Sequence, residues 1–482
     1  GVHAVVLAIV AVALFSTAAV AADSWSVTAD GETTTVTYNG SGTVDDPYLI
    51  DGNNSMMLVR LQGIESAPGD EKHFKMTSGI DASTTSEWNN GDGFIPIPQV
   101  FGGSLDGNNF TITDMYIDAS DDSTLTNAGL FSHIENFEIN HLTLANITVI
   151  NTPTNSDSGA IAGLSGAQSS LIEDVHVTGS IISGGSTGGL IGYDESFQTD
   201  IQRSSFVGDI SARNAAGGLI GTAASGDSID ISDSYVILSS VSTSLSDATA
   251  HAIVDSEDVS LSGESDPTGN ISNVYAVVES LSGSARVTGY NGISNTNVYI
   301  QDNGPNFAGM APLAQANMTD IAAVQNMTFS SWIDTWVVTD SYPELLGNNG
   351  GDEPAAILFD GSATVSPAAP DAGDTVTVSV PLLNLGGTSG SETLTLTYNG
   401  QTVDNNTVNL VRGSASTALT WDSSVSDGGT RTLTIASSSQ SQDIPVTLTQ
   451  VNIPPTVTNR SVTVTAGETV SGDILANASD AD

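Results

Sequence analysis

The sequence predicts an all-β protein in which a parallel β-solenoid is followed by antiparallel β-sandwich modules. The first observation is an internal repeat with a spacing of 29 residues. Glycine-rich segments recur at this spacing: GAIAG at 159–163, GGLIG at 188–192 and GGLIG at 217–221. The sequences between them recur in the same phase, as IEDVHVTGSI at 172–181 and IQRSSFVGDI at 201–210. A period of this length is typical of stacked repeat proteins. The second observation is a series of short alternating strands after residue 354.

The repeat unit explains why the coils must stack. Each unit contains short β-rich runs broken by Gly, Ser and Asn, and none has the apolar period of a helix. One unit cannot bury its apolar side chains, whereas stacked units align equivalent residues in columns. The alternative is an antiparallel array such as a propeller, although a blade of four strands is usually longer than this repeat. The expected columns are Leu130, Ile161, Leu190 and Leu219, beside Phe131, Ala162, Ile191 and Ile220.

Composition limits the classes of function. The 482 residues include 9 Lys+Arg and 55 Asp+Glu, a net charge of −46, and no cysteine. The lack of Cys excludes disulfides and thiolate metal sites. A surface this acidic does not favour nucleic acid or anionic membranes as partners. Two causes would account for this negative charge. One is life at high salt, which screens the repulsion between the acidic side chains, and the other is a large number of calcium sites. We favour a halophilic or marine source, with calcium as a local addition.

The first 125 residues are predicted to hold a targeting segment and the start of the solenoid. Residues 1–22 are interpreted as a partial secretory signal peptide, because an apolar run ends in the small residues Ala19, Val20 and Ala21. A membrane anchor helix or a pilin-type leader is the alternative. Residues 23–125 are expected to begin and cap the stack, with aromatic side chains covering its open end: Trp88, Phe94, Phe101 and Phe110. The basic segment around His73 is interpreted as a surface loop.

Residues 126–346 are predicted to form the repeat solenoid with a C-terminal cap. The motif NVY recurs at 273–275 and 297–299, which favours a stacked column of tyrosines over a ligand platform. The segment 310–346 is expected to form a closing helix and strand that cover the last coil. We interpret Trp332 and Trp336 as part of this cap, and a sugar-stacking surface is the alternative.

The C-terminal part follows a different pattern. Residues 347–354 have the composition of a linker. Residues 355–450 contain seven or so alternating strands, with turn signals at 371–373, 399–400 and 427–429, which predicts an antiparallel β-sandwich. Residues 451–482 are predicted to form the truncated start of another such module.

Several motifs resemble those of known families. The GGLIG repeats, together with DPYLI, FGGSLDGNNFTITDMYI, AGLFSHI and the ending FSSWIDTWVVTDSYPELL, resemble GLUG-motif secreted surface proteins. This resemblance implies a right-handed β-helix in an adhesin-like or peptidase-associated exoprotein, and it transfers no catalytic residue. Residues 355–450 resemble a CARDB-type Ig-like domain. Residues 451–482 resemble the start of a cadherin-like bacterial Ig repeat, a type that often binds calcium at its boundaries. Asp480 and Asp482 fit that pattern, but two carboxylates do not complete a calcium site.

The search for catalytic groups yields only carboxylate clusters. A polysaccharide hydrolase needs paired carboxylates on one face, but 55 acidic residues produce such clusters by number alone. A lyase would need a basic residue, and Arg203 and Arg213 do not align across the repeat. The histidines have no metal-ligand spacing. The clusters are Asp121-Asp122, Asp227-Asp230-Asp233 and Asp255-Glu257-Asp258.

The sequence therefore predicts a non-catalytic extracellular adhesin or cell-surface scaffold. Its solenoid would present a regular face to a glycan, to a surface protein or to another copy of the chain, and no membrane span would remain after signal cleavage. Calcium is the one cofactor expected. The alternatives are a polysaccharide-active β-helix lyase or hydrolase, and a structural fibre or sheath subunit.

Overall fold

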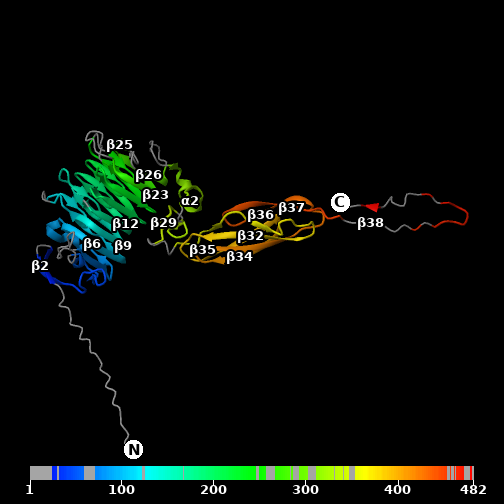
Figure 1. The fold of residues 1–482 in the computed structure, drawn as a ribbon, viewed down its shortest axis with the longest axis horizontal. Coiled ribbons are helices and arrows are strands. Elements are labelled where there is room, and N and C mark those ends of the chain that lie inside the picture. The colour runs from blue at the N-terminus through cyan, green and yellow to red at the C-terminus, as the bar shows by residue number, and fades with distance from the viewer. Residues whose placement is uncertain are drawn as a thin grey trace, which may run out of the picture.

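The protein consists of a stack of β-coils joined to an elongated β-sandwich (Figure 1). The predicted signal segment and most of the predicted linker lie outside the residues that this computed structural model describes. The described residues are 24–29, 32–58, 71–121, 125–166, 168–245, 249–256, 266–282, 284–285, 293–301, 311–329, 332–339, 341–346, 353–452, 456–457, 461, 463–469, 471 and 478–479.

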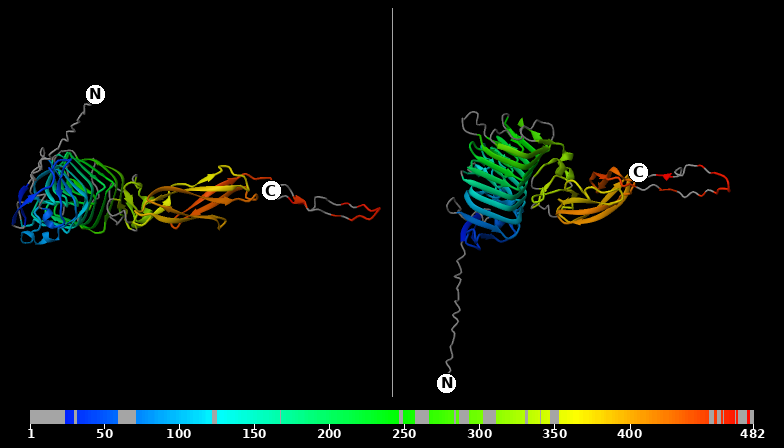
Figure 2. Two further views of the ribbon diagram at one scale, coloured as in Figure 1. Left: turned by 90° about the horizontal axis from the view of Figure 1, so that it is seen from below. Right: turned by 45° about the vertical axis from the view of Figure 1, so that its right-hand side comes forward.

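The coils of the solenoid follow one another along a single axis, as Figure 2 shows. An antiparallel hairpin precedes them, formed by β1 (Ser24–Ala29) and β2 (Glu32–Thr37). The first coils contain β3 (Tyr48–Ile50), η1 (Ser55–Met57), β4 (Lys72–Met76), β5 (Ile80–Asp81), η2 (Ser83–Gly91), β6 (Ile97–Thr113), β7 (Tyr116–Asp118), β8 (Asn127–Ala128) and β9 (Phe131–Asn151). The repeat region contains β10 (Asp157–Ser158), β11 (Ala162–Ser165), β12 (Ser169–Ser183), β13 (Ser186–Gly188), β14 (Ile191–Asp194), β15 (Gln198–Gln202), β16 (Ser205–Ala212), β17 (Ala215–Gly217) and β18 (Ile220–Ala223). The later coils contain β19 (Ser228–Ser232), β20 (Tyr235–Thr243), β21 (Thr249–His251), β22 (Val254–Ser256), β23 (Thr268–Val278), β24 (Leu281–Ser282), β25 (Ser284–Ala285), β26 (Ile293–Gln301) and β27 (Ala311–Leu313).

Pairing between the coils is parallel, so the predicted parallel β-solenoid is confirmed. The predicted columns are also found. Ala162 pairs with Phe131 and Ile191, and Ile191 pairs with Ile220. The two repeated segments align Gly179 with Gly208. The propeller alternative is therefore wrong.

The interior of the stack is an apolar column that runs from coil to coil. One inner row contains Ile139, Ile172, Ile201, Ile231 and Ile271, paired in that order. All five side chains are at most 1% exposed. β-branched side chains suit this position because they pack well against the rows above and below. No single coil could bury them alone.

The aromatic residues near the start of the stack do not all lie at an open end. The ring centroid of Phe101 is 5.6 Å from that of Phe74 and 4.7 Å from that of Phe131. The expectation that Phe101 caps the stack is wrong, because coils already precede it: β3 pairs in parallel with β4, and β4 with β6. Tyr38, whose ring centroid lies 5.1 Å from that of Tyr48, extends this aromatic row toward the N-terminal side.

The segment 311–346 adds to the last coil and then packs on the outside of the stack. Strand β27 pairs in parallel with β26. The chain continues through η4 (Gln315–Asn317), α2 (Asp320–Asn326), β28 (Trp336–Val337) and β29 (Glu344–Leu345). These elements cover an outward row of Tyr235, Tyr275 and Tyr299, whose backbones pair across three strands. The tyrosines thus form the predicted column, with the rings of Tyr235 and Tyr275 stacked at 5.2 Å.

Trp332 and Trp336 belong to the same cluster. They are 8% and 0% exposed, so neither offers a sugar-stacking surface. We call this cluster the junction core, because it also includes Leu358, Leu383 and Leu385 from the sandwich. The expected cap is therefore a connector between the solenoid and the next domain. Its helix is shorter than the spacing predicted, since Leu313 lies in β27.

Two antiparallel four-stranded sheets form the sandwich. One sheet contains β30 (Ile357–Phe359), β31 (Thr364–Ser366), β32 (Thr375–Asn384) and β35 (Gly413–Asp422), and the other contains β33 (Gly390–Tyr398), β34 (Gln401–Leu410), β36 (Gly429–Ala436) and β37 (Ser441–Leu448). Their inward side chains form a separate apolar core. The β33–β34 hairpin turns at Asn399 and Gly400, with φ of 47° and 76°. Positive φ at both positions explains why the sequence uses Asn-Gly there.

Beyond the sandwich, β38 (Thr456–Val457) pairs with β39 (Ala478–Ser479) in an antiparallel bridge. None of the helices in the described ranges is both long and apolar enough to cross a membrane.

Candidate binding face on the solenoid

One sheet of the solenoid presents to solvent a row of side chains that is polar except at Leu171. The row is built by parallel pairing, which places one residue from each coil directly beside its neighbour, about 4.8 Å away. We call this row the polar face. Its members, in order along the axis, are His73, Ser104, Glu138, Leu171, Asp200, Asp230, Asn270 and Ser294.

A groove of about 440 Å³ lies over the N-terminal half of the polar face. We call it the face groove. Strands β4, β6, β9, β12 and β15 all contribute to its lining, so it depends on five stacked strands. The lining residues are Glu71, His73, Gly103, Asn136, Phe137, Glu138, Ser169, Ser170, Leu171 and Asp200.

Amide side chains orient the carboxylates of the face groove. Asn136 donates to Glu71 at 3.1 Å, Asn140 to Glu138 at 2.8 Å, and Gln198 to Asp200 at 2.9 Å. In each case one carboxylate oxygen accepts this bond. No ion pair joins Glu138 or Asp200 to any residue that the structure describes. The groove therefore carries fixed negative charge and fixed hydrogen-bond acceptors.

His73 was missed as a site residue. It lies on strand β4, not in the expected surface loop, and its Nδ1 is 2.8 Å from Ser104 Oγ on the next coil. The one sequence signal for this position would have been the alignment of His73 with Ser104. That alignment follows from strand pairing, which the weak repeat in this region does not reveal.

The corner beside the polar face is a ladder of residues with left-handed backbone. Each has φ between 45° and 55°, and each occupies the same position in successive coils. Asn and Asp tolerate this conformation better than other non-glycine residues. We call this set the corner ladder: His141, Asp174, Arg203, Asp233, Asn273 and Asn297.

Side-chain bonds run along the corner ladder from coil to coil. Arg203 donates to both oxygens of Asp174, from Nε at 2.8 Å and from Nη2 at 3.0 Å, and it also pairs with Glu173. Asn273 donates to Asp233 at 3.1 Å, and Asn297 donates to Asn273 at 3.1 Å. These bonds link neighbouring coils along the corner ladder, and the guanidinium of Arg203 is already paired with Asp174 and Glu173.

The described members of the predicted carboxylate clusters occupy separate positions in the coils. Asp230 accepts from the backbone N–H of Asn270 at 2.9 Å, whereas Asp233 belongs to the corner ladder. Asp227 is 7% exposed. Asp255 lies 2.9 Å from His251, and the two side chains are 2% and 4% exposed, so a substrate could not reach them. Asp121 is exposed on a turn, and Asp122, Glu257 and Asp258 lie outside the described residues.

Buried titratable groups lie in the body of the solenoid. Asp194 is fully buried and accepts from Thr199 Oγ1 at 3.0 Å, and burial raises its pKa to about 6. Burial also raises the pKa of Asp157 to about 6 and lowers that of His176 to about 4. Each of the three pKa shifts favours the neutral form of the side chain, because a charged group is less stable away from water. These groups affect the stability of the coils.

The predicted calcium residues cannot be placed. Asp480 and Asp482 lie outside the described residues. Within the described part of the chain, no group of three or more His, Asp or Glu side chains is arranged to hold a metal ion.

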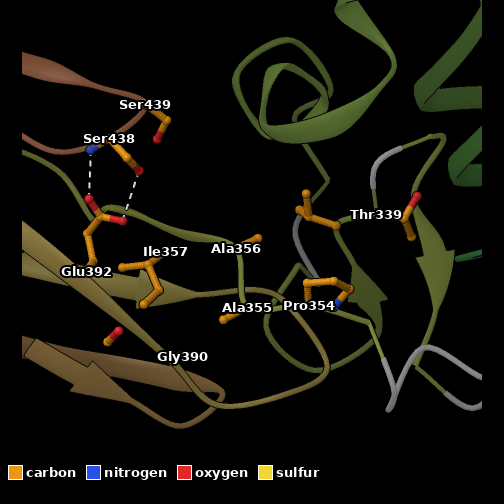
Figure 3. Close-up of a pocket in the computed structure, with 11 residues that line it drawn as sticks. Thr339, Pro354, Ala355, Ala356, Ile357, Gly390, Glu392, Ser438 and Ser439 are labelled. Atoms are coloured by element: carbon orange, nitrogen blue, oxygen red, sulfur yellow. Dashed lines mark hydrogen bonds between the residues drawn. The ribbon is translucent and has the colours of Figure 1, made fainter.

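A second hollow lies between the connector and the sandwich (Figure 3). Its volume is about 260 Å³. One side is apolar, with Pro354, Ala355 and Ile357, and the other side carries Glu392. The carboxylate of Glu392 already accepts from the N–H and the hydroxyl of Ser438, at 2.7 and 2.9 Å. We regard this hollow as packing space at the junction.

Comparison with known proteins gives one sequence relative. No family model matches the chain, so the resemblances to GLUG, CARDB and cadherin-like modules stay predictions. Halomucin of Haloquadratum walsbyi (strain DSM 16790 / HBSQ001) is 36% identical over 177 residues. The match covers 34% of this chain and 2% of that protein, so the chain spans only a small part of its relative.

Two solved structures are similar at a low level. A putative immunoglobulin A1 protease from Bacteroides ovatus has a TM-score of 0.47 and 17% identity, over 64% of this chain and 95% of that one. A structure described as IgA1 protease has a TM-score of 0.38 and 18% identity, over 58% of this chain and 22% of that one. We draw no conclusion about activity from similarities at this level.

Proposed function

We propose that this chain is an extracellular, non-catalytic adhesin or surface scaffold whose solenoid binds its partner through the polar face. The face groove is the observation that supports this most directly. It is built from five stacked strands and lined by oriented acceptors. A shallow groove that crosses several coils suits an extended chain, because acceptors on successive strands can contact successive units of that chain.

The bulk properties agree with a location outside the cell at high salt. A net charge of −46 is better tolerated when salt screens self-repulsion. The sandwich would act as a spacer between the solenoid and whatever anchors it. Calcium at Asp480 and Asp482 is part of the same proposal.

The test is binding and turnover in one experiment. The full chain is applied at 2 M NaCl, with and without calcium, to immobilised glycans and surface proteins, and released products are measured. Retention of the protein with intact ligands is the expected result. Cleaved glycans or cleaved protein would contradict the proposal and direct attention to an enzyme. Retention only by the chain itself would favour a fibre or sheath subunit.

A further inference from the structure

We propose that the face groove binds a neutral or amine-bearing glycan and excludes acidic glycans, with Phe197 as the stacking platform at its rim. This inference rests on the proposed function and names the class of ligand for the same groove. It starts from a side chain that the fold does not explain.

Phe197 is 74% exposed and is the one exposed phenylalanine among the described residues. It lies at the coil corner just before β15. Its neighbours in the adjacent coils are Gln168 and Asp227, because Gln198 pairs with Ser169 and Thr199 pairs with Ile229. Both neighbours are polar, so Phe197 is not one member of an apolar column. A single exposed apolar residue needs no explanation by itself, but this one adjoins a groove.

In the chain, Phe197 directly precedes strand β15, which contributes Asp200 to the lining of the groove. The following residue, Gln198, holds the groove carboxylate of Asp200 through a 2.9 Å bond, and its strand partner Ser169 lines the groove. An aromatic ring beside oriented acceptors matches the two surfaces of a sugar ring, which has an apolar face of C–H groups and an edge of hydroxyls. Leu171 adds an apolar contact within the groove.

The charge of the groove determines which glycans fit. Glu138 and Asp200 lie two coils apart on the polar face, with no ion pair to a described residue. A glycan with carboxylate or sulfate groups would meet like charge at contact distance, where high salt screens least. Hydroxyls can donate to these oxygens, and amines can donate and also neutralise them.

The test uses the full chain on an array of neutral, amine-bearing and acidic glycans, at 0.2 M and 2 M NaCl. We expect binding to neutral or amine-bearing glycans and none to acidic ones. The variant Phe197→Ala should weaken binding about tenfold, and its matched control Val411→Ala, which removes an equally exposed apolar side chain from the sandwich, should have no effect. The double variant Glu138→Gln, Asp200→Asn should narrow the preference for neutral over acidic glycans.

Each other outcome has a definite meaning. Strong binding to acidic glycans, or full binding by Phe197→Ala, would overturn the glycan class while leaving the binding face in place. Binding to an oligolysine peptide with no glycan bound would also overturn it, in favour of a basic protein partner. If no glycan, peptide or surface protein is retained, both this inference and the proposed function fail. Circular dichroism of each variant confirms that loss of binding is not loss of fold.

Discussion

At the scale of single residues, the solenoid keeps a carboxylate buried among its coils without a counter-charge from the part of the chain that the structure describes. Asp194 is fully buried, yet one of its oxygens has no hydrogen-bond partner among the described residues. Burying a carboxylate without a counter-charge favours its protonated form, which is why burial raises its pKa to about 6. The coil accepts this group because neighbouring apolar rows supply most of the stability. Asp194 is therefore a site where substitution can stabilise the protein.

The first prediction concerns the pH dependence of Asp194. Its folded pKa of about 6 is above the ordinary value of 3.8, so its contribution to stability is present at low pH and is lost as pH rises through 6. The variant Asp194→Asn lacks this loss. The unfolding free energy of the variant, relative to the unchanged protein, should rise by about 3 kcal/mol between pH 3.5 and pH 7.5.

Chemical denaturation at several pH values measures this difference. The groove residue Asp200 is partly exposed, and Asp200→Asn serves as the matched carboxylate-to-amide control. Equal stability differences at the two ends of the pH range would show that Asp194 is not buried as described.

At the scale of elements, the coil corners determine which residues the repeat must keep. Gly208 has φ of 157°, and a Cβ there would lie 1.8 Å from the carbonyl oxygen of Gly179 in the neighbouring coil. Gly179 has the same relation to Ile147, at 2.1 Å. The glycines at this corner allow the backbones of successive coils to approach. The neighbouring corner ladder instead uses polar residues that tolerate left-handed backbone.

The second prediction tests the glycine corner. Gly208→Ala should destabilise the solenoid by about 3 kcal/mol or more, because the clash is with backbone that cannot rotate away. Gly226 is the matched control, since it also has positive φ, 87°, but nothing lies within 4 Å of its Cβ position. Gly226→Ala should cost only about 1 kcal/mol, the cost of the backbone conformation. Thermal unfolding would contradict this explanation if both variants lost the same stability.

The third prediction tests the corner ladder. Arg203 has φ of 45° and is about one-third exposed, so its ion pairs contribute little. Arg203→Asn, which copies Asn273 and Asn297 of the same ladder, should change stability by less than about 1 kcal/mol. Arg203→Val should cost about 2 kcal/mol more, because a β-branched residue is strained in left-handed backbone. If the two variants lose the same stability, the ion pairs of Arg203, and not its backbone conformation, determine which residues are tolerated at this position.

The sequence predicts the elements of the repeat region better than it predicts the site. Aligned glycines mark equivalent corners, so the pairing of Gly179 with Gly208 could be derived from spacing. The polar face could not, because its spacing varies. Strand register shifts between Asp106 and Phe110, and the step from Asp230 to Asn270 is 40 residues. The exposed Phe197 carried no periodic signal at all.

At the scale of the whole molecule, the connector joins two cores into one structure. The junction core contains side chains from the solenoid, the connector and the sandwich. Arg412, from the turn before β35, reaches across it. Its guanidinium donates to the carbonyl oxygens of Leu385 and Gly386 in the sandwich and of Trp332, Ile333 and Trp336 in the connector, at 2.6 to 3.3 Å. The sequence predicted this segment to be a cap on the last coil. Its contacts with the sandwich could not be predicted, because contacts between distant segments produce no local sequence pattern.

The fourth prediction concerns Arg412. Arg412→Ala would remove the guanidinium donor from these carbonyl oxygens. The carbonyl of Leu385 keeps the N–H of Val338 as a donor, and each buried carbonyl that is left without a donor costs about 1–3 kcal/mol. We expect the sandwich and the solenoid to unfold in two separate calorimetric transitions in this variant and in closer coupling in the unchanged protein. Arg431→Ala, which removes an arginine within the sandwich, should leave the coupling intact. A single transition at an unchanged temperature would show that the apolar contacts suffice.

The fifth prediction concerns salt. With a net charge of −46, the folded chain repels itself at low ionic strength. The melting temperature should therefore rise between 0.1 M and 2 M NaCl, as the screening length falls from about 10 Å to about 3 Å or less. Sucrose at matched osmolarity controls for exclusion of solute from the surface. A melting temperature that responds equally to sucrose and to NaCl would contradict the charge explanation.

The row of tyrosines beneath the connector also determines how the molecule would bear tension. A sandwich attached to the tip of the stack would peel the last coil away when pulled. Here the connector holds Tyr235, Tyr275 and Tyr299 on three successive coils, and Tyr275 donates to the carbonyl oxygen of Pro343 at 2.6 Å. A pull through the sandwich is thus shared sideways by several coils, whose strand bonds would have to break together. A surface protein exposed to flow would therefore need a larger pulling force to unfold.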